Sequence, residues 1–190
     1  MKKFIGPIMI LAFVTVSFVG CTDNSVTNPV SSDNSHILLE TKPGNGSTIV
    51  EIAASNSDFE YLVAAVQFAG LVDVLSGNRQ FTVFAPTDQA FEDLADTLGL
   101  ASVEELLVPE NKDLVTNVLL YHVSPGNKNS NNVVKSGRVN TLLNQFIYSK
   151  VEDGAVKVGN DANGFANVVA VDIRATNGTI HVLDKVLLPQ

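Results

Sequence analysis

The chain has 190 residues, of which 45% are hydrophobic and 17% are charged, a balance typical of globular rather than disordered proteins. Its formal charge of -8 at pH 7 argues against nucleic acid as a partner, because an acidic surface repels phosphate backbones. The single cysteine, Cys21, excludes an internal disulfide and supplies too few ligands for a usual zinc or iron–sulfur site. These numbers indicate one globular domain with additional segments.

The first 20 residues begin with two lysines after the initial methionine and continue as an apolar run that ends at Gly20-Cys21. A basic start, an apolar stretch of about 15 residues and a small residue before the break are typical of a secretory signal. Residues 18–21 (Phe-Val-Gly-Cys) resemble a bacterial lipobox, which implies that Cys21 is acylated and anchors the mature chain to a membrane. The alternative is an uncleaved membrane helix, although the run is shorter than the roughly 20 residues that span a bilayer comfortably. Since Thr22 and not Asp follows the cysteine, the expected location is the outer membrane or cell surface.

Residues 21–46 are rich in Ser, Asn, Thr, Asp, Pro and Gly. Such a segment buries too little apolar surface to offset its conformational entropy, so we expect a flexible tether. The folded domain is expected to cover residues 47–190, where the apolar content rises and periodic patterns begin.

Residues 47–120 read mainly as helices. Residues 57–60 (Ser-Asp-Phe-Glu) have the spacing of a capping box, and apolar residues at 59, 62, 63 and 66 predict a helix over 58–69. A second such box at 102–105 begins a short helix, and Pro109 suits the first turn of the next.

One strand interrupts these helices at residues 81–86. Its apolar side chains point to both faces, which predicts a strand buried on both sides. Pro86 ends the strand, and Thr87 or Asp88 is expected to cap the helix that follows.

After Tyr121 the apolar pattern becomes alternating, which is typical of strands. Turn pairs such as Asn163-Gly164 and Asn177-Gly178 supply the positive φ angles of tight hairpins. Helices first and strands later indicate an α+β domain rather than a doubly wound sheet. The expected strands cover residues 133–134, 139–143, 145–151, 155–158, 167–173 and 179–188.

Three motifs in this order resemble the fasciclin I domain family. Residues 81–91 resemble its first signature, residues 175–188 its second, and Tyr121-His122 the Tyr-His pair between them. The resemblance implies a single fasciclin-like domain, in which a helical N-terminal half packs on a β-wedge of two sheets. It also implies a non-catalytic role in adhesion.

The residues themselves show no catalytic or metal-binding spacing. The three histidines, His36, His122 and His181, form no zinc-binding pattern, and there is no nucleophile elbow or phosphate-binding loop. We therefore expect no enzyme, no metal and no cofactor.

Two pairs of residues are candidates for partner binding through the family resemblance. For Tyr121 and His122 the residues favour a structural role at a helix-to-strand junction, while the resemblance implies adhesion. For Asp172 and Ile173 the resemblance implies a recognition edge, and the plainer interpretation is an exposed Asp beside a core Ile.

The sequence thus predicts a lipid-anchored, monomeric surface protein with one fasciclin-like domain that mediates adhesion. Its expected partners are a cell-surface or matrix protein or a polysaccharide. One alternative is a binding module for a small hydrophobic or carbohydrate ligand, which needs a concave pocket between helices and sheet. Another is a factor in envelope assembly or symbiosis.

Overall fold

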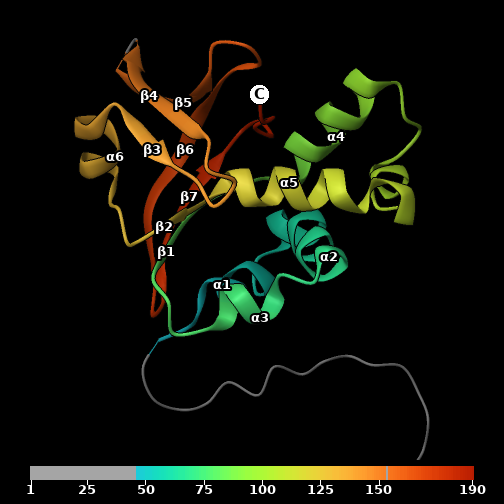
Figure 1. The fold of residues 1–190 in the computed structure, drawn as a ribbon, viewed down its shortest axis with the longest axis horizontal. Coiled ribbons are helices and arrows are strands. Elements are labelled where there is room, and N and C mark those ends of the chain that lie inside the picture. The colour runs from blue at the N-terminus through green and yellow to red at the C-terminus, as the bar shows by residue number, and fades with distance from the viewer. Residues whose placement is uncertain (1–45, 153) are drawn as a thin grey trace, which may run out of the picture. The chain divides into compact units, whose positions relative to one another are not determined.

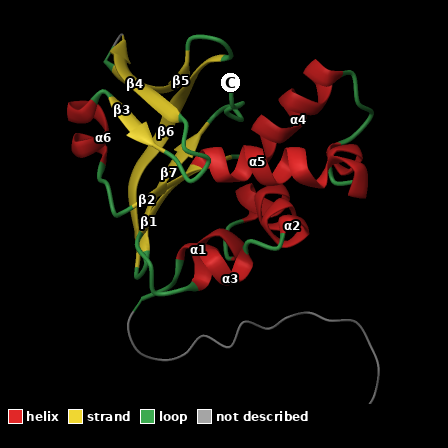
Figure 2. Ribbon diagram, viewed as in Figure 1, coloured by secondary structure: helices red, strands yellow, loops and turns green. Residues whose placement is uncertain are grey.

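The computed structural model describes residues 46–152 and 154–190. Cys21, the expected signal at residues 1–20 and the tether up to residue 45 lie outside these residues. Helices dominate the first half of the domain and strands the second, so the α+β class is confirmed (Figures 1 and 2). The helices are α1 (Ile49–Ala54), α2 (Glu60–Ala69), α3 (Val72–Ser76), α4 (Asp88–Leu98), α5 (Lys112–His122) and α6 (Ser130–Ser136), with short 3-10 helices η1 (Ser57–Phe59), η2 (Val103–Leu106) and η3 (Pro109–Asn111).

Seven strands of the described residues form one continuous sheet in the order β2-β1-β7-β6-β5-β4-β3. Among these strands only the β1–β7 pair is parallel. The strands are β1 (Phe81–Pro86), β2 (Val123–Pro125), β3 (Arg138–Asn140), β4 (Phe146–Glu152), β5 (Ala155–Asn160), β6 (Gly164–Ala175) and β7 (Gly178–Leu183).

The expected division into two sheets is not confirmed, and the long strand β6 explains why. Its first residues, up to Asn167, pair with β5, and its later residues pair with β7 from Val168 onward, with two register shifts between Val168 and Ile173. Bulges of this kind bend a strand and increase its twist. One strand therefore carries the chain from one half of the sheet to the other, and no break separates them.

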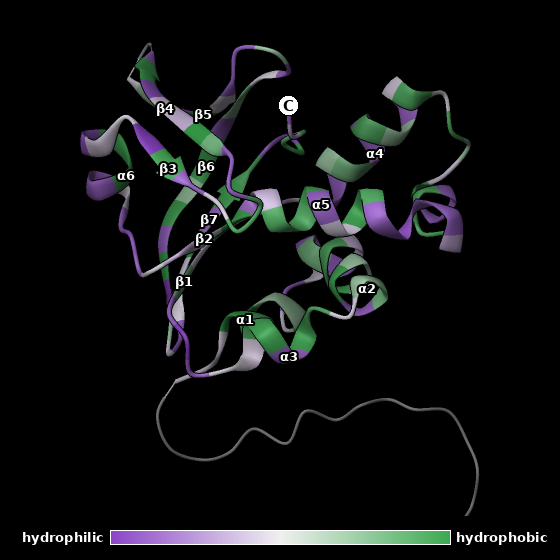
Figure 3. Ribbon diagram, in the orientation of Figure 1, coloured by the Kyte–Doolittle hydropathy of each residue, from purple (hydrophilic) through white to green (hydrophobic). Residues whose placement is uncertain are grey.

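Strand β1 is buried on both faces, as its sequence predicts. Phe81, Val83 and Ala85 belong to the larger core, which the helices cover, and Phe84 belongs to a second core with Ile147 and other residues of the strands. Figure 3 shows hydrophobic residues along the helices α1, α2 and α3. Each face of this strand therefore contacts a separate hydrophobic cluster.

The helix starts differ from the expected capping boxes. The amides of Glu60 and Tyr61 donate to the carboxylate of Asp88 at 3.1 and 2.9 Å, so the N-terminus of α2 is capped from α4. Residues 57–60 begin with η1 instead. The capping box that does form joins Thr48 and Glu51 at the start of α1, a Thr-x-x-Glu pattern that the sequence analysis missed.

At residues 102–105 the second predicted box is also wrong. Glu105 accepts a hydrogen bond from the amide of Ala101 at 3.2 Å, and the side chain of Ser102 caps no amide of η2. Thr87 occupies the cap position of α4 without a side-chain bond, and the carboxylate of the neighbouring Asp88 caps α2 instead of α4.

The strand predicted at residues 133–134 is wrong, because this segment is helix α6. The side chain of Asn129 accepts a hydrogen bond from the amide of Asn132 at 2.9 Å and caps the helix, and Gly137 ends it with φ of 66°. Valine favours strands, but here the strong helix start and stop residues on either side outweigh the preference of two adjacent valines.

The predicted turn at Asn177-Gly178 is confirmed and has a second role. Asn177 is buried, and its amide side chain bonds to the backbone of Ile49, Leu75 and Gly77. Gly178 is required because a Cβ there would lie 1.9 Å from the carbonyl oxygen of Phe81. The turn therefore ties the helices α1 and α3 to the start of β7.

Candidate functional site

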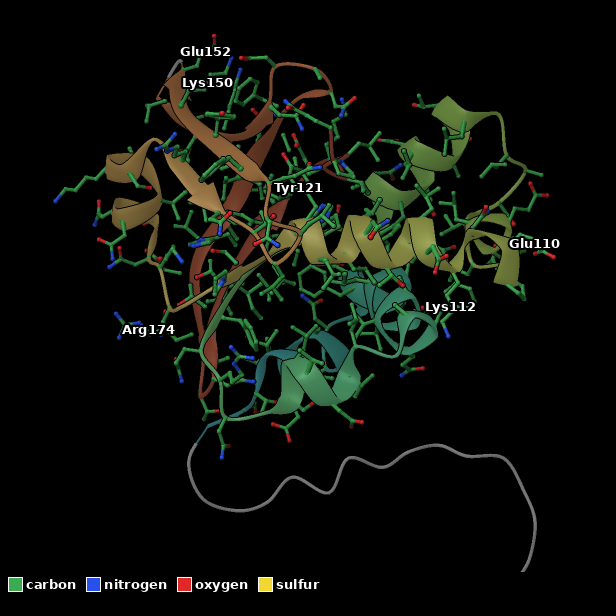
Figure 4. The ribbon with its side chains drawn as sticks, viewed as in Figure 1. Glu110, Lys112, Tyr121, Lys150, Glu152 and Arg174 are labelled. Atoms are coloured by element: carbon green, nitrogen blue, oxygen red, sulfur yellow. The ribbon has the colours of Figure 1, made fainter. Side chains whose placement is uncertain are left out.

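Tyr121 and His122 end α5 inside the domain. Figure 4 labels Tyr121 where this helix meets the sheet. Their exposed fractions are 0% and 2%. The amide of Leu187 donates to Nε2 of His122 at 2.9 Å, so Nδ1 carries the proton and donates to the carbonyl of Val118 at 2.7 Å. Burial lowers the pKa of His122 to about 4, which keeps the ring neutral at pH 7.

The hydroxyl of Tyr121 links three parts of the chain. It donates to the carbonyl of Phe146 at 3.0 Å and accepts from the side-chain amide of Asn160 at 2.9 Å. The same amide of Asn160 donates to the carbonyl of Leu188 at 2.8 Å. Burial raises the pKa of Tyr121, so the hydroxyl stays protonated as a donor. The pair thus holds α5, β4, β5 and the C-terminal residues together.

Asp172 lies in the bulged part of β6 with a positive φ of 60°. Its carboxylate accepts hydrogen bonds from the amide and the hydroxyl of Ser130, at 2.7 and 2.6 Å. These bonds lower the pKa of Asp172 and fix the first residue of α6 against the sheet. Asp172 is therefore half-buried, and its carboxylate is hydrogen-bonded to Ser130 instead of standing free at the edge of the sheet.

His181 completes this cluster from β7. The amide of Asp172 donates to Nδ1 of His181 at 3.3 Å, so Nε2 carries the proton and donates to the carbonyl of Lys128 at 3.0 Å. Burial lowers the pKa of His181. The ring of His181, in β7, therefore joins the bulge of β6 to the loop that precedes α6.

The exposed residues of this segment are ones that the sequence analysis did not select. Val169 and Val171 are 58% and 45% exposed, whereas Ile173 is half-buried and packs against the larger core. An exposed valine in an alternating strand is the signal that could have pointed to them. The structure therefore brings Asp172 together with Ser130 and His181, and leaves Val169 and Val171 exposed to solvent.

The buried polar groups serve the fold in this arrangement. In the described part of the chain, every buried side-chain nitrogen and oxygen has a hydrogen-bond partner. Residues 46–152 and 154–190 hold no group of three or more His, Cys, Asp or Glu side chains placed to bind a metal ion. Within the same residues no helix is both long and apolar enough to cross a membrane.

An apolar cavity of about 190 Å³ lies between α4, η2 and α5. Its lining is almost entirely hydrocarbon, and two of its residues, Leu98 and Leu114, are more than half exposed to solvent. The lining includes Leu94, Leu98, Leu106, Val115, Leu119 and His122.

Comparison with known proteins relates this fold to a family. A family model described as "Fasciclin domain" matches residues 57–189. Protein sll1483 of Synechocystis is 44% identical over 159 residues, which cover 84% of this chain and 83% of that protein. Immunogenic protein MPB70 of Mycobacterium bovis is 32% identical over 176 residues, which cover 90% and 80%. Transforming growth factor-beta-induced protein ig-h3 of Sus scrofa is 32% identical over 142 residues, but this region is only 19% of that protein.

A solved structure shares the fold. It is described as a FAS1 domain pair from the insect cell adhesion molecule Fasciclin I, and it matches with a TM-score of 0.68 and 21% sequence identity. The match covers 76% of this chain and 52% of that one.

Proposed function

Because this chain belongs to the fasciclin domain family, we propose that it is a non-catalytic adhesion protein anchored by a lipid on Cys21. Its single domain binds a protein or polysaccharide of a cell surface or matrix, and acts as a monomer in the envelope. Support comes from the relatives, one of which is described as a cell adhesion molecule. Fold alone is weak support for function, so the proposal depends on the surface of the domain.

The observation that carries the proposal is the exposed segment of β6. Val169 and Val171 are apolar and exposed to solvent. The next residue, Asp172, is fixed by two hydrogen bonds from Ser130. A rigid backbone with exposed apolar side chains loses little entropy on binding. Tyr121 and His122 are buried, so in this proposal they stabilise the domain and do not contact the partner.

We expect beads that carry the full chain to be retained by cells that produce it and by matrix extracted from them. The variant Asp172→Asn keeps an acceptor for Ser130 and tolerates the positive φ, but removes the charge, and should reduce retention at least threefold. Retention is measured as bound beads against bead concentration. The control is Asp161→Asn, which removes the same charge from an exposed turn.

Equal retention of both variants would remove Asp172 from the binding surface. Absence of retention by a chain with a normal melting curve would contradict adhesion and favour the alternative below.

The lipid anchor is tested separately with Cys21→Ser. We expect this variant to lose acyl labelling and to leave the membrane fraction, because the thiol is the only site for the diacylglycerol. The measurement is the distribution of the chain between membrane and soluble fractions. If the variant stays in the membrane, the apolar run of the first 20 residues is an uncleaved anchor instead.

A second function is favoured by the apolar cavity between α4, η2 and α5. At about 190 Å³ it suits a small hydrophobic molecule, and its lining offers almost no polar group to orient a sugar. Of the two ligands that the sequence left open, the cavity therefore favours the hydrophobic one.

A further inference from the structure

The acidic charge of the domain is concentrated in its helical half. Residues 46–113 carry 12 acidic and 2 basic side chains, whereas residues 114–190 carry 5 acidic and 7 basic ones. The first segment contains α1 to α4, and the second contains every strand except β1. The net charge is therefore -10 for residues 46–113 and +2 for residues 114–190. The net charge of the whole chain, -8, does not show this difference.

Strand β4 presents aromatic rings to solvent within the less acidic part. Phe146 and Tyr148 are 40% and 41% exposed, and Ile147 between them is fully buried in the second core. Alternate residues of a strand share a face, so both rings and Lys150 lie on the solvent side of the sheet. Large aromatic side chains on an open sheet face are candidates for an interaction surface.

The strand register places basic residues beside these rings. Arg138 of β3 lies opposite Tyr148, and Lys157 of β5 lies opposite Lys150. The next pairing brings Phe165 of β6 opposite Gly159, two residues from Lys157. We call this surface the β3–β6 face. It consists of Arg138, Phe146, Tyr148, Lys150, Lys157 and Phe165.

Two of the cations rest on aromatic rings. The guanidinium carbon of Arg138 lies 4.8 Å from the ring centre of Phe146, and Nζ of Lys150 lies 4.1 Å from that of Phe165. Such contacts hold a cation in place while it stays open to water. Arg138 makes no ion pair with any residue that the structure describes, so its charge is available to an anion.

One carboxylate offsets part of this charge. Glu152 lies 2.8 Å from Nζ of Lys157 and 3.5 Å from Nζ of Lys150 (Figure 4 labels Lys150 and Glu152). These lysines lower the pKa of Glu152, so it is ionised at pH 7. Among the residues that the structure describes, three cations against one carboxylate leave the β3–β6 face net positive.

We infer that the β3–β6 face binds an acidic polysaccharide, one whose sugar rings carry carboxylates. Sugar rings pack their apolar C–H faces on exposed aromatic side chains, and carboxylates pair with guanidinium and ammonium groups. The face extends over four strands, a shape that suits a linear polymer. The acidic helical half repels the same polymer and so directs it to the sheet.

This inference gives the proposed adhesion a class of partner and rests on that function for its biological setting. It uses a different set of side chains from the segment around Asp172. The two surfaces can therefore be tested separately.

The test uses the full chain, purified in neutral detergent and immobilised, with polygalacturonate as the probe. We expect saturable binding that weakens as salt increases, and little binding of neutral dextran. The double variant Arg138→Gln, Lys150→Gln should lower the affinity at least tenfold. The matched control, Arg79→Gln, Lys112→Gln, removes two exposed charges from the helical half and should stay within twofold of the parent.

A third variant separates stacking from charge. Tyr148→Ser should weaken binding severalfold and leave its dependence on salt unchanged, because it removes a ring and no charge. All variants alter exposed side chains, and melting temperatures within 3 °C of the parent would show that the fold is retained.

Several results would overturn the inference. An equal loss of affinity for polygalacturonate in both double variants would show that binding responds only to the net charge of the chain. Binding of dextran as tight as that of polygalacturonate would show that the face does not recognise carboxylates. Binding to vesicles with anionic lipid but not to polygalacturonate would assign the face to a membrane. Self-association reversed by the Arg138→Gln, Lys150→Gln variant, without polymer binding, would assign it to the acidic half of a second copy. None of these results changes the outcome expected for Asp172→Asn on cells.

Discussion

Replacement of His122 by alanine is expected to lower the free energy of unfolding by about 3 kcal/mol. The ring is buried and forms two hydrogen bonds to the backbone, one from the amide of Leu187 and one to the carbonyl of Val118. Alanine leaves the Leu187 amide unpaired in the interior and opens a cavity between α5 and the C-terminal residues. The effect is measured by urea unfolding of the full chain at pH 7.

The control for this experiment is Asn117→Ala on the exposed face of the same helix, which should change stability by less than 0.5 kcal/mol. If His122→Ala unfolds like the parent, the structural role of this ring is wrong. If its stability is unchanged but cell adhesion is lost, the residue acts in partner binding, as the family resemblance implies.

Acidification from pH 7 to pH 4 is expected to remove about 3 kcal/mol of stability through His122 alone. The pKa of this ring is 6.5 in the unfolded chain and about 4 in the folded one. Between these values the unfolded state binds the proton more readily, so its population increases as the pH falls. The contribution is fully present above pH 6.5 and lost towards pH 4. His181, whose pKa is also lowered by burial, adds to the loss.

This prediction is checked by urea unfolding at pH 7.0, 5.5 and 4.0. The variant His122→Gln is uncharged throughout and should lose less stability over this range than the parent. The carboxylate of Asp172 does not disturb the comparison, because its pKa lies below the ordinary 3.8 and its contribution is lost only at lower pH. The same pH dependence in parent and variant would contradict the assignment to His122.

Strand β1 and the turn at Asn177-Gly178 could be predicted from the sequence because their signals are local. A strand with apolar residues on both faces has few other environments, and Asn-Gly pairs fit few backbone conformations. The error at Val133 and Val134 arose where two signals competed, and the caps at Asn129 and Gly137 prevailed.

The capping error at residues 57–60 has a different cause. The Ser-x-x-Glu pattern is genuine, but the carboxylate of Asp88 reaches the same amides from another helix. A distant group can satisfy a helix start as well as a local one, and no local pattern reports its presence.

The candidate site shows the same limit. The sequence selected Tyr121, His122, Asp172 and Ile173, and the structure buries the first two and ties the third to Ser130. The exposed residues Val169 and Val171 depend on register shifts in β6, which follow from pairing with β7 and not from the alternation of the strand itself.

By itself the sequence determined the α+β class, the buried central strand and the family, because these depend on local periodicity, turn residues and short motifs. Only the tertiary structure decided that the strands form one sheet, that both core histidines are neutral, and that aromatic and basic residues from four strands share one face. These features arise from contacts between residues far apart in the chain, and their energies depend on burial and register.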